Sequence, residues 1–194
     1  MNQTLAPTPF PWIDVVIILA LIALNGVFAM SELAIVSARR PRLQAAQKAG
    51  KGGAQTALLL ADDPGKFLST VQIGITLIGI VAGAYSGASL GHPVAERLEV
   101  AGMDDDLAVS VGFALVIGLT TFASLIVGEL VPKQIALRSP EPIAMLVARP
   151  MLTLSRVTAP VVWLLDGSSA LIFRALRLNR QTDDHVTAEE LHLI

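Results

Sequence analysis

Three long stretches without a charged side chain stand out along the chain. They cover residues 15–31, 67–91 and 107–127, which are 17, 25 and 21 residues long. A helix of about 20 apolar residues spans the hydrocarbon core of a bilayer. The pattern therefore predicts three transmembrane helices and an all-α integral membrane protein.

The composition agrees with this prediction. Of the 194 residues, 53% are hydrophobic and 15% are charged, and the mean hydropathy is +0.64. Soluble domains carry about 25% charged residues. A net charge of −2 offers no basic surface for a nucleic acid. The absence of cysteine excludes disulfides, zinc–thiolate sites and cysteine nucleophiles. We expect the lipid bilayer as a partner, no nucleic acid, and no enzymatic activity.

The basic residues gather on one side of the predicted spans. Residues 38–66 contain six Lys or Arg, whereas residues 92–106 contain one, against five acidic residues. Cytoplasmic loops of membrane proteins carry the excess of Lys and Arg. The chain is therefore predicted to lie in the cell membrane with its N-terminus outside and its C-terminus in the cytoplasm. No basic residue precedes the first span, so a cleaved signal peptide is not expected.

Beyond the third span, prolines cut the chain into apolar segments of about ten residues, too short to cross a bilayer. Residues 1–136 are therefore predicted to form the three-span core, and residues 137–180 a cytoplasmic-side belt of short amphipathic helices. A fourth span over residues 157–173 is the alternative, although Asp166 would lie inside it. Residues 181–194, with the capping-box pattern Thr187 to Glu190, are expected to start a linker to a cytosolic domain missing from this chain.

The end of the third span carries a pattern suited to cation binding. Pro132 has no N–H and cannot bond the carbonyl of Gly128, four residues earlier. That carbonyl, the carboxylate of Glu129 and nearby hydroxyls are hard oxygen ligands, which suit Mg²⁺, Ca²⁺ or Na⁺. The alternative is that Glu129 only forms an ion pair with Lys133, one helical turn later.

Polar residues also lie in the other two spans. Asn25 and Glu32 are seven residues apart and share one helical face, while Ser31 lies about 100° away. Asn25 could line a cation pathway or hold two helices together. Glu32 could pair with a neighbouring arginine, Arg39 or Arg40.

In the second span, Ser69, Gln72 and Thr76 form one stripe. The predicted orientation places Ser69 at the same depth as Glu32 and Glu129. Each hydroxyl could instead bond the backbone of its own helix. The same span repeats glycine every four residues, which lets another helix approach closely, within one chain or between two copies. Since three spans enclose little alone, a homodimer is expected. The glycines are Gly79, Gly83, Gly87 and Gly91.

Three of these motifs resemble the transmembrane domain of the CorC/CNNM family of magnesium transport proteins. They are Asn25-Gly-x-Phe-Ala-x-Ser-Glu-Leu-Ala34, Pro64-Gly-x-Phe-Leu-Ser-Thr-Val-Gln-Ile-Gly-Ile-Thr-Leu77 and Gly128-Glu-Leu-x-Pro-Lys133. The resemblance covers about residues 12–190. It implies a homodimer with three spans and a helical belt in each protomer. It also implies cytosolic CBS-type domains that bind ATP, which are expected to be missing from this chain.

The resemblance also implies a set of cation ligands. The hydroxyl of Ser31, the carbonyl of Gly128 and the carboxylate of Glu129 match it, and Ser69 is preferred over its neighbour Thr70 for the second span. The implied activity is Mg²⁺ export, with Na⁺ influx as the candidate driving force. The alternative is a membrane Mg²⁺ sensor or scaffold without transport; a channel is disfavoured because no continuous polar stripe is evident. Further candidate contacts are Thr70, Asn25, Gln72, Glu32, Pro132 and Lys133.

Overall fold

The computed structural model describes residues 8–176, and all regular structure in that part of the chain is helical. Three stretches in it, Trp12–Ser37, Gly65–Val100 and Asp105–Arg138, are long and apolar enough to cross a membrane, which confirms the predicted three-span fold. The predicted linker start, residues 181–194, lies outside the described residues. The elements are α1 (Trp12–Ser37), α2 (Arg40–Lys48), α3 (Ala54–Asp62), α4 (Gly65–Val100), α5 (Asp105–Leu125), the π-helical turn η1 (Ile126–Leu130), α6 (Val131–Arg138), α7 (Pro140–Val157) and α8 (Ala159–Ala175).

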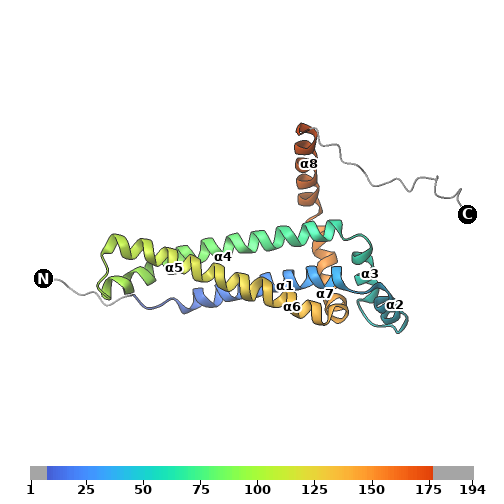
Figure 1. Ribbon diagram of the computed structural model, residues 1–194, viewed down its shortest axis with the longest axis horizontal. Coiled ribbons are helices and arrows are strands. Elements are labelled where there is room, and N and C mark those ends of the chain that lie inside the picture. The colour runs from blue at the N-terminus through green and yellow to red at the C-terminus, as the bar shows by residue number, and fades with distance from the viewer. Residues whose placement is uncertain (1–7, 177–194) are drawn as a thin grey trace, which may run out of the picture.

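The three spans run side by side as a long bundle, with α4 packed along both α1 and α5 (Figure 1). Ile18 and Ile22 of α1, Leu90 of α4 and Val116 of α5 form one buried cluster that joins all three. Only 22–28% of the most apolar window of each span is buried inside the molecule. The rest of this apolar surface faces outward, as expected of helices surrounded by lipid.

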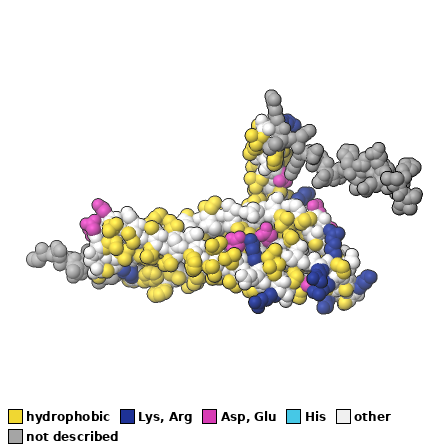
Figure 2. Space-filling model, viewed as in Figure 1, with side chains coloured by type: hydrophobic (Ala, Val, Ile, Leu, Met, Phe, Trp, Pro, Cys, Tyr) yellow, Lys and Arg dark blue, Asp and Glu magenta, His cyan; other side chains and the backbone are white. Residues whose placement is uncertain are grey.

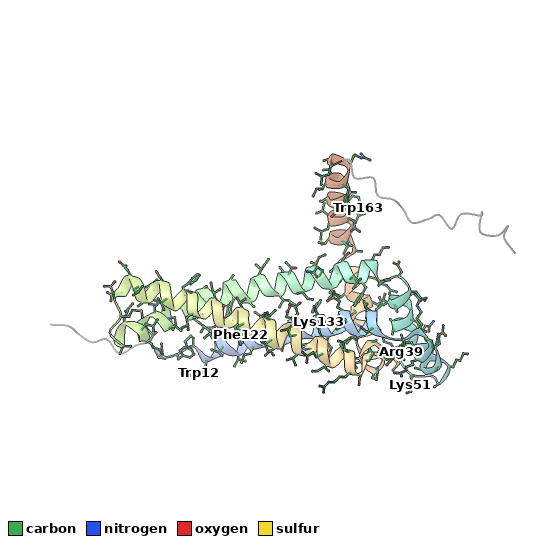
Figure 3. All side chains as sticks on the ribbon, in the orientation of Figure 1. Trp12, Arg39, Lys51, Phe122, Lys133 and Trp163 are labelled. Atoms are coloured by element: carbon green, nitrogen blue, oxygen red, sulfur yellow. The ribbon has the colours of Figure 1, made fainter. Side chains whose placement is uncertain are left out.

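The helices α2, α3 and α7 gather at one end of the bundle (Figure 1). One hydrophobic cluster joins six helices there, through Ala34, Leu43, Ala57, Phe67, Ala136 and Ala144. Arginines and lysines lie at the same end, where Figure 3 labels Arg39 and Lys51. The uneven distribution of charge along the sequence therefore becomes a difference in charge between the two ends of the molecule. The orientation of these ends in the membrane stays a prediction.

Glu141, near the start of α7, is a buried carboxylate that links α7 to Arg39 and Arg42. It is 8% exposed, accepts a hydrogen bond from the Arg39 backbone N–H at 3.3 Å, and lies 3.6 Å from the Arg42 guanidinium. Burial acts to raise the pKa of Glu141. Its own backbone N–H, the Arg39 N–H and the Arg42 charge outweigh burial and hold the pKa below its ordinary value. The ionised form of Glu141 therefore stabilises this junction.

The second span is longer than predicted. The sequence suggested a loop from residue 92, but α4 continues through Pro93 as far as Val100. Ala95 is fully buried here, and its backbone N would lie 2.9 Å from a Cβ placed on Gly112 of α5. This close packing against α5 stabilises the helix beyond the proline.

The expectation of ten-residue segments after the third span was wrong for α7. This helix has 18 residues and runs through Pro150. It packs against α1 and α3, and buries Ala144, Val147, Ala148 and Met151, so it belongs to the core of this end. Pro140 and Pro160 lie instead at the starts of α7 and α8, where the missing N–H costs nothing.

The last described helix, α8, points away from the bundle (Figure 1). Of its residues only Val162 is buried, and Trp163, labelled in Figure 3, is 76% exposed. The axes of α7 and α8 differ by 65°, and the two helices together are long and apolar enough to form one broken span. The surface belt stays a prediction.

Candidate functional site

The third span changes its helical geometry at the predicted site. Residues Ile126–Leu130 form a π-helical turn, in which the Val131 N–H donates to the carbonyl of Ile126, five residues earlier. Pro132 follows directly and has no N–H to offer Gly128. Such π-helical turns within α-helices are frequent at functional sites. The irregular backbone predicted around Gly128 and Pro132 is therefore present.

Asn25 of α1 fills the space beside this turn. Its side-chain Nδ2 donates to the Gly128 carbonyl at 3.1 Å, and the side chain is only 4% exposed. A Cβ on the next residue, Gly26, would lie 3.0 Å from Cγ of Pro132, so α1 approaches the turn closely. Asn25 thus joins two helices, one of the two roles considered for it. Its Oδ1 is buried and has no hydrogen-bond partner among the described residues.

Three charged side chains meet beside the turn. Lys133 Nζ lies 2.8 Å from Oε1 of Glu129 and 3.9 Å from Oε2 of Glu32. These side chains are 32%, 37% and 26% exposed, in that order. Figure 2 shows magenta and dark blue atoms together on an otherwise yellow and white face, in the region where Figure 3 labels Lys133. We call Glu32, Glu129 and Lys133 the charged triad.

The triad shows which partners Glu129 and Glu32 have in the folded chain. The ion pair between Glu129 and Lys133 is confirmed. The pairing of Glu32 with Arg39 or Arg40 was wrong: within the described residues, Arg40 pairs with Asp62 at 3.1 Å, and Glu32 faces Lys133. The physical reason is that α1 ends at Ser37 and the chain turns into an extended segment, so both arginines leave the face of α1 that carries Glu32.

A hollow of about 210 Å³ opens between α4 and α5 and reaches Glu129. Glu129 therefore lines the hollow and also belongs to the charged triad. Three hydroxyls line the same hollow, and none of them makes a hydrogen bond within the described part of the chain, whereas several hydroxyls elsewhere in the spans bond their own helix. The lining residues are Gly79, Ala82, Gly83, Thr120, Thr121, Ser124, Leu125 and Glu129.

The sequence pointed to hydroxyls near Glu129 as hard oxygen ligands but did not single out these three. The available signal was their spacing, since Thr120 and Ser124 are one helical turn apart and precede Glu129 by nine and five residues. The glycine ridge of α4 supplies the other wall. The half of this ridge that is more distant from Glu129 packs within the chain, because a Cβ on Gly87 or Gly91 would contact Phe113. Gly79 and Gly83, in contrast, have open space around them among the described residues.

The remaining predicted ligands are engaged elsewhere or exposed. Ser31 is fully buried and donates to the Val27 carbonyl at 2.6 Å. Thr70 is also buried; it donates to the Lys66 carbonyl, and its Oγ1 lies 2.9 Å from Oγ1 of Thr158. Ser69 is half-buried, and Gln72 and Thr76 are exposed.

The described structure thus brings together one group of the predicted residues. No hydrogen bond joins Ser31, Ser69 or Thr70 to the turn in that part of the chain, and no cluster of three or more His, Asp or Glu is placed there to hold a metal. A hard cation would therefore need carbonyl, amide or hydroxyl oxygens in addition to the carboxylates. The grouped residues are Asn25, Glu32, Gly128, Glu129, Pro132 and Lys133.

Comparison with known proteins gives a consistent set of relatives. The family model described as the cyclin M transmembrane N-terminal domain (CNNM) matches residues 16–194. The UPF0053 protein sll0260 of Synechocystis is 43% identical over 182 residues, which cover 94% of this chain and 41% of that protein. The UPF0053 protein YhdT of Bacillus subtilis is 35% identical over 188 residues, 93% of this chain and 40% of that protein.

A relative with a functional name is more distant. The polyamine export protein of Escherichia coli is 29% identical over 181 residues, which cover 93% of this chain and 40% of that protein. The chain therefore spans about two fifths of the length of the curated relatives it matches.

Proposed function

The chain belongs to the CNNM transmembrane-domain family, and on this basis we propose that it is a membrane transport domain whose cargo is a cation bound at Glu129. One observation carries the proposal: Glu129 lies in a membrane-spanning helix, lines the hollow, and is paired with Lys133. An ionisable side chain within a span is costly, and such residues commonly mark ion pathways.

Mg²⁺ is the proposed cargo because the oxygens around the π-helical turn are hard ligands. The Glu129 carboxylate supplies the charge. The Gly128 carbonyl and the Asn25 Oδ1, which has no hydrogen-bond partner among the described residues, are the neutral oxygens at the turn. Mg²⁺ sheds its waters reluctantly and usually keeps several. A water molecule occupies about 30 Å³ in the liquid, so the hollow of about 210 Å³ has room for a partly hydrated ion that meets the hydroxyls of α5.

We propose export as the direction and Na⁺ influx as the driving force, with both cations competing for Glu129. The hydroxyls of Ser31 and Ser69 can join the ligand set if their helices shift, and Ser31 must then release the Val27 carbonyl. Thr70 is the alternative to Ser69, and it would have to leave the Lys66 carbonyl and Thr158.

A polyamine is the second candidate cargo. A relative is named a polyamine export protein, and the triad already holds a primary ammonium, that of Lys133, between two carboxylates. A polyamine ends in the same group. Its methylene chain would fit the apolar part of the hollow, formed by Gly79, Ala82 and Leu125.

Flux measurements in lipid vesicles containing the purified chain test these proposals. Mg²⁺ and putrescine uptake are measured for the unaltered chain, for Glu129→Gln, and for Asp105→Asn as a control. Asp105 is an exposed carboxylate at the start of α5, outside the hollow and the triad. We expect Mg²⁺ flux that Glu129→Gln abolishes and Asp105→Asn retains. Flux of putrescine alone would favour the second cargo, and Mg²⁺ binding without flux would favour the sensor or scaffold. Undiminished flux in Glu129→Gln would contradict the site.

A further inference from the structure

We infer that Lys133 is a tethered competitor of the cargo, and that Glu32 receives the Lys133 ammonium when a cation binds Glu129. This inference rests on the proposed function, because it assigns a regulatory role to two residues of the same site. It explains why two carboxylates from different helices face one lysine.

The geometry gives the two carboxylates different roles. The ammonium makes a short, charge-assisted hydrogen bond to Glu129 at 2.8 Å, whereas Glu32 lies at 3.9 Å, within ion-pair range but too far for a hydrogen bond. An ammonium shift on the order of 1 Å would exchange the two partners. Glu129 is on η1 and Glu32 is on α1, so the exchange would move the ion pair of Lys133 from its own span to the neighbouring helix.

The side chains are free enough to make this exchange. Each of the three side chains is about one-third exposed, so the ion pair is not fully buried. A lysine has a flexible four-carbon stem and an ammonium whose three donors rotate freely. Within the described residues, neither carboxylate has another basic partner that would oppose the movement.

The competition between Lys133 and the cargo has an electrostatic reason. An empty, ionised Glu129 inside a span would be costly, and the Lys133 charge neutralises it. An incoming cation must displace that charge, so its affinity is lowered and its release is favoured. Glu32 keeps the displaced ammonium paired, which prevents a second uncompensated charge beside Glu129.

Mg²⁺ titration of the purified chain tests this inference through a double-mutant cycle. Removing the competitor with Lys133→Gln should tighten Mg²⁺ binding about tenfold, the factor associated with one charge-assisted hydrogen bond. Lys133→Arg keeps the charge and should retain weak binding. Glu32→Gln should weaken binding, because Lys133 then has only Glu129 as a partner. In the Lys133→Gln background, Glu32→Gln should have no further effect, since Glu32 acts through Lys133.

Each outcome bears on the inference. Unchanged or weaker binding in Lys133→Gln would overturn it, as would a loss of affinity on adding Glu32→Gln to Lys133→Gln, which would make Glu32 a direct ligand. Thermal melting of each variant in detergent checks that it is folded. Failure of the proposed function has a different signature, because Mg²⁺ binding would then be indifferent to Glu129→Gln in every background.

Discussion

The side-chain amide of Asn25 donates a hydrogen bond to the carbonyl of Gly128 at 3.1 Å and so joins the first span to the π-helical turn of the third. These residues are 103 positions apart in the chain. The bond gives the Gly128 carbonyl a partner beside Pro132, which has no N–H to donate. It also leaves the Asn25 Oδ1 buried and unpaired within the described structure.

Replacing Asn25 tests how far this hydrogen bond holds the spans together. Asn25→Leu keeps the size of the side chain but removes the donor to Gly128. A buried carbonyl without a partner costs about 1–3 kcal/mol, so the melting temperature in detergent should fall. The control is Gln134→Leu, which removes an exposed amide on α6 and should change the stability little. Equal melting temperatures for the two variants would show that the Asn25 bond adds nothing.

Gly26 should not tolerate a larger side chain. The Cβ of an alanine there would lie 3.0 Å from Cγ of Pro132 and 3.2 Å from the Val127 carbonyl, and would push α1 away from the turn. Overpacking of this kind costs about 1–3 kcal/mol. Gly79→Ala is the matched control, because no atom of residues 8–176 outside its own helix lies within 4 Å of the added Cβ. Thermal melting should show a loss for Gly26→Ala alone, and a loss of the same size in both variants would contradict the close approach.

Filling the hollow should block transport without unfolding the chain. Gly83→Leu places a large side chain where no described residue outside its own helix lies within 4 Å of the Cβ, on the wall that faces the hydroxyls of α5. We expect normal melting and a loss of most cation flux. Gly118→Leu is the control, since Gly118 also has open space around it but does not line the hollow. Full flux in Gly83→Leu would show that the cargo does not use the hollow.

The stability contributed by Glu141 should depend on pH. Its pKa is lower in the folded chain than in the unfolded one, so its contribution is complete above the unfolded pKa and is lost as pH falls through the folded pKa. Glu141→Gln should therefore melt at a lower temperature than the unaltered chain at about pH 7, and the difference should shrink at about pH 3. The exposed carboxylate of Asp63 provides a control through Asp63→Asn. A difference independent of pH would exclude the ionised carboxylate as its cause.

The sequence was informative where a property is local. Runs without charge predicted the three spans, and the spacing of Gly128 and Pro132 predicted irregular backbone at the site. The continuation of α4 through Pro93 was not predictable, because it depends on the packing of Ala95 against Gly112 of α5. The same is true of α7 and Pro150, since that helix packs between distant parts of the chain.

The composition of the site could be predicted only in part. The pair of Glu129 and Lys133 follows from a spacing of four residues in one helix. The approach of Glu32 to Lys133 depends on how α1 packs against α6, which no spacing within either helix reveals. The hydroxyls of α5 were visible in the sequence, but only the hollow opposite Gly79 and Gly83 gives them a common environment.

Calorimetric titration of the purified chain with Mg²⁺, repeated with Glu129→Gln and with Na⁺ present, tests the central claim most directly. We predict saturable Mg²⁺ binding that Na⁺ weakens, that Glu129→Gln abolishes and that Asp105→Asn leaves unchanged. Mg²⁺ binding of equal strength in the unaltered chain and in Glu129→Gln would contradict a cation site at the π-helical turn.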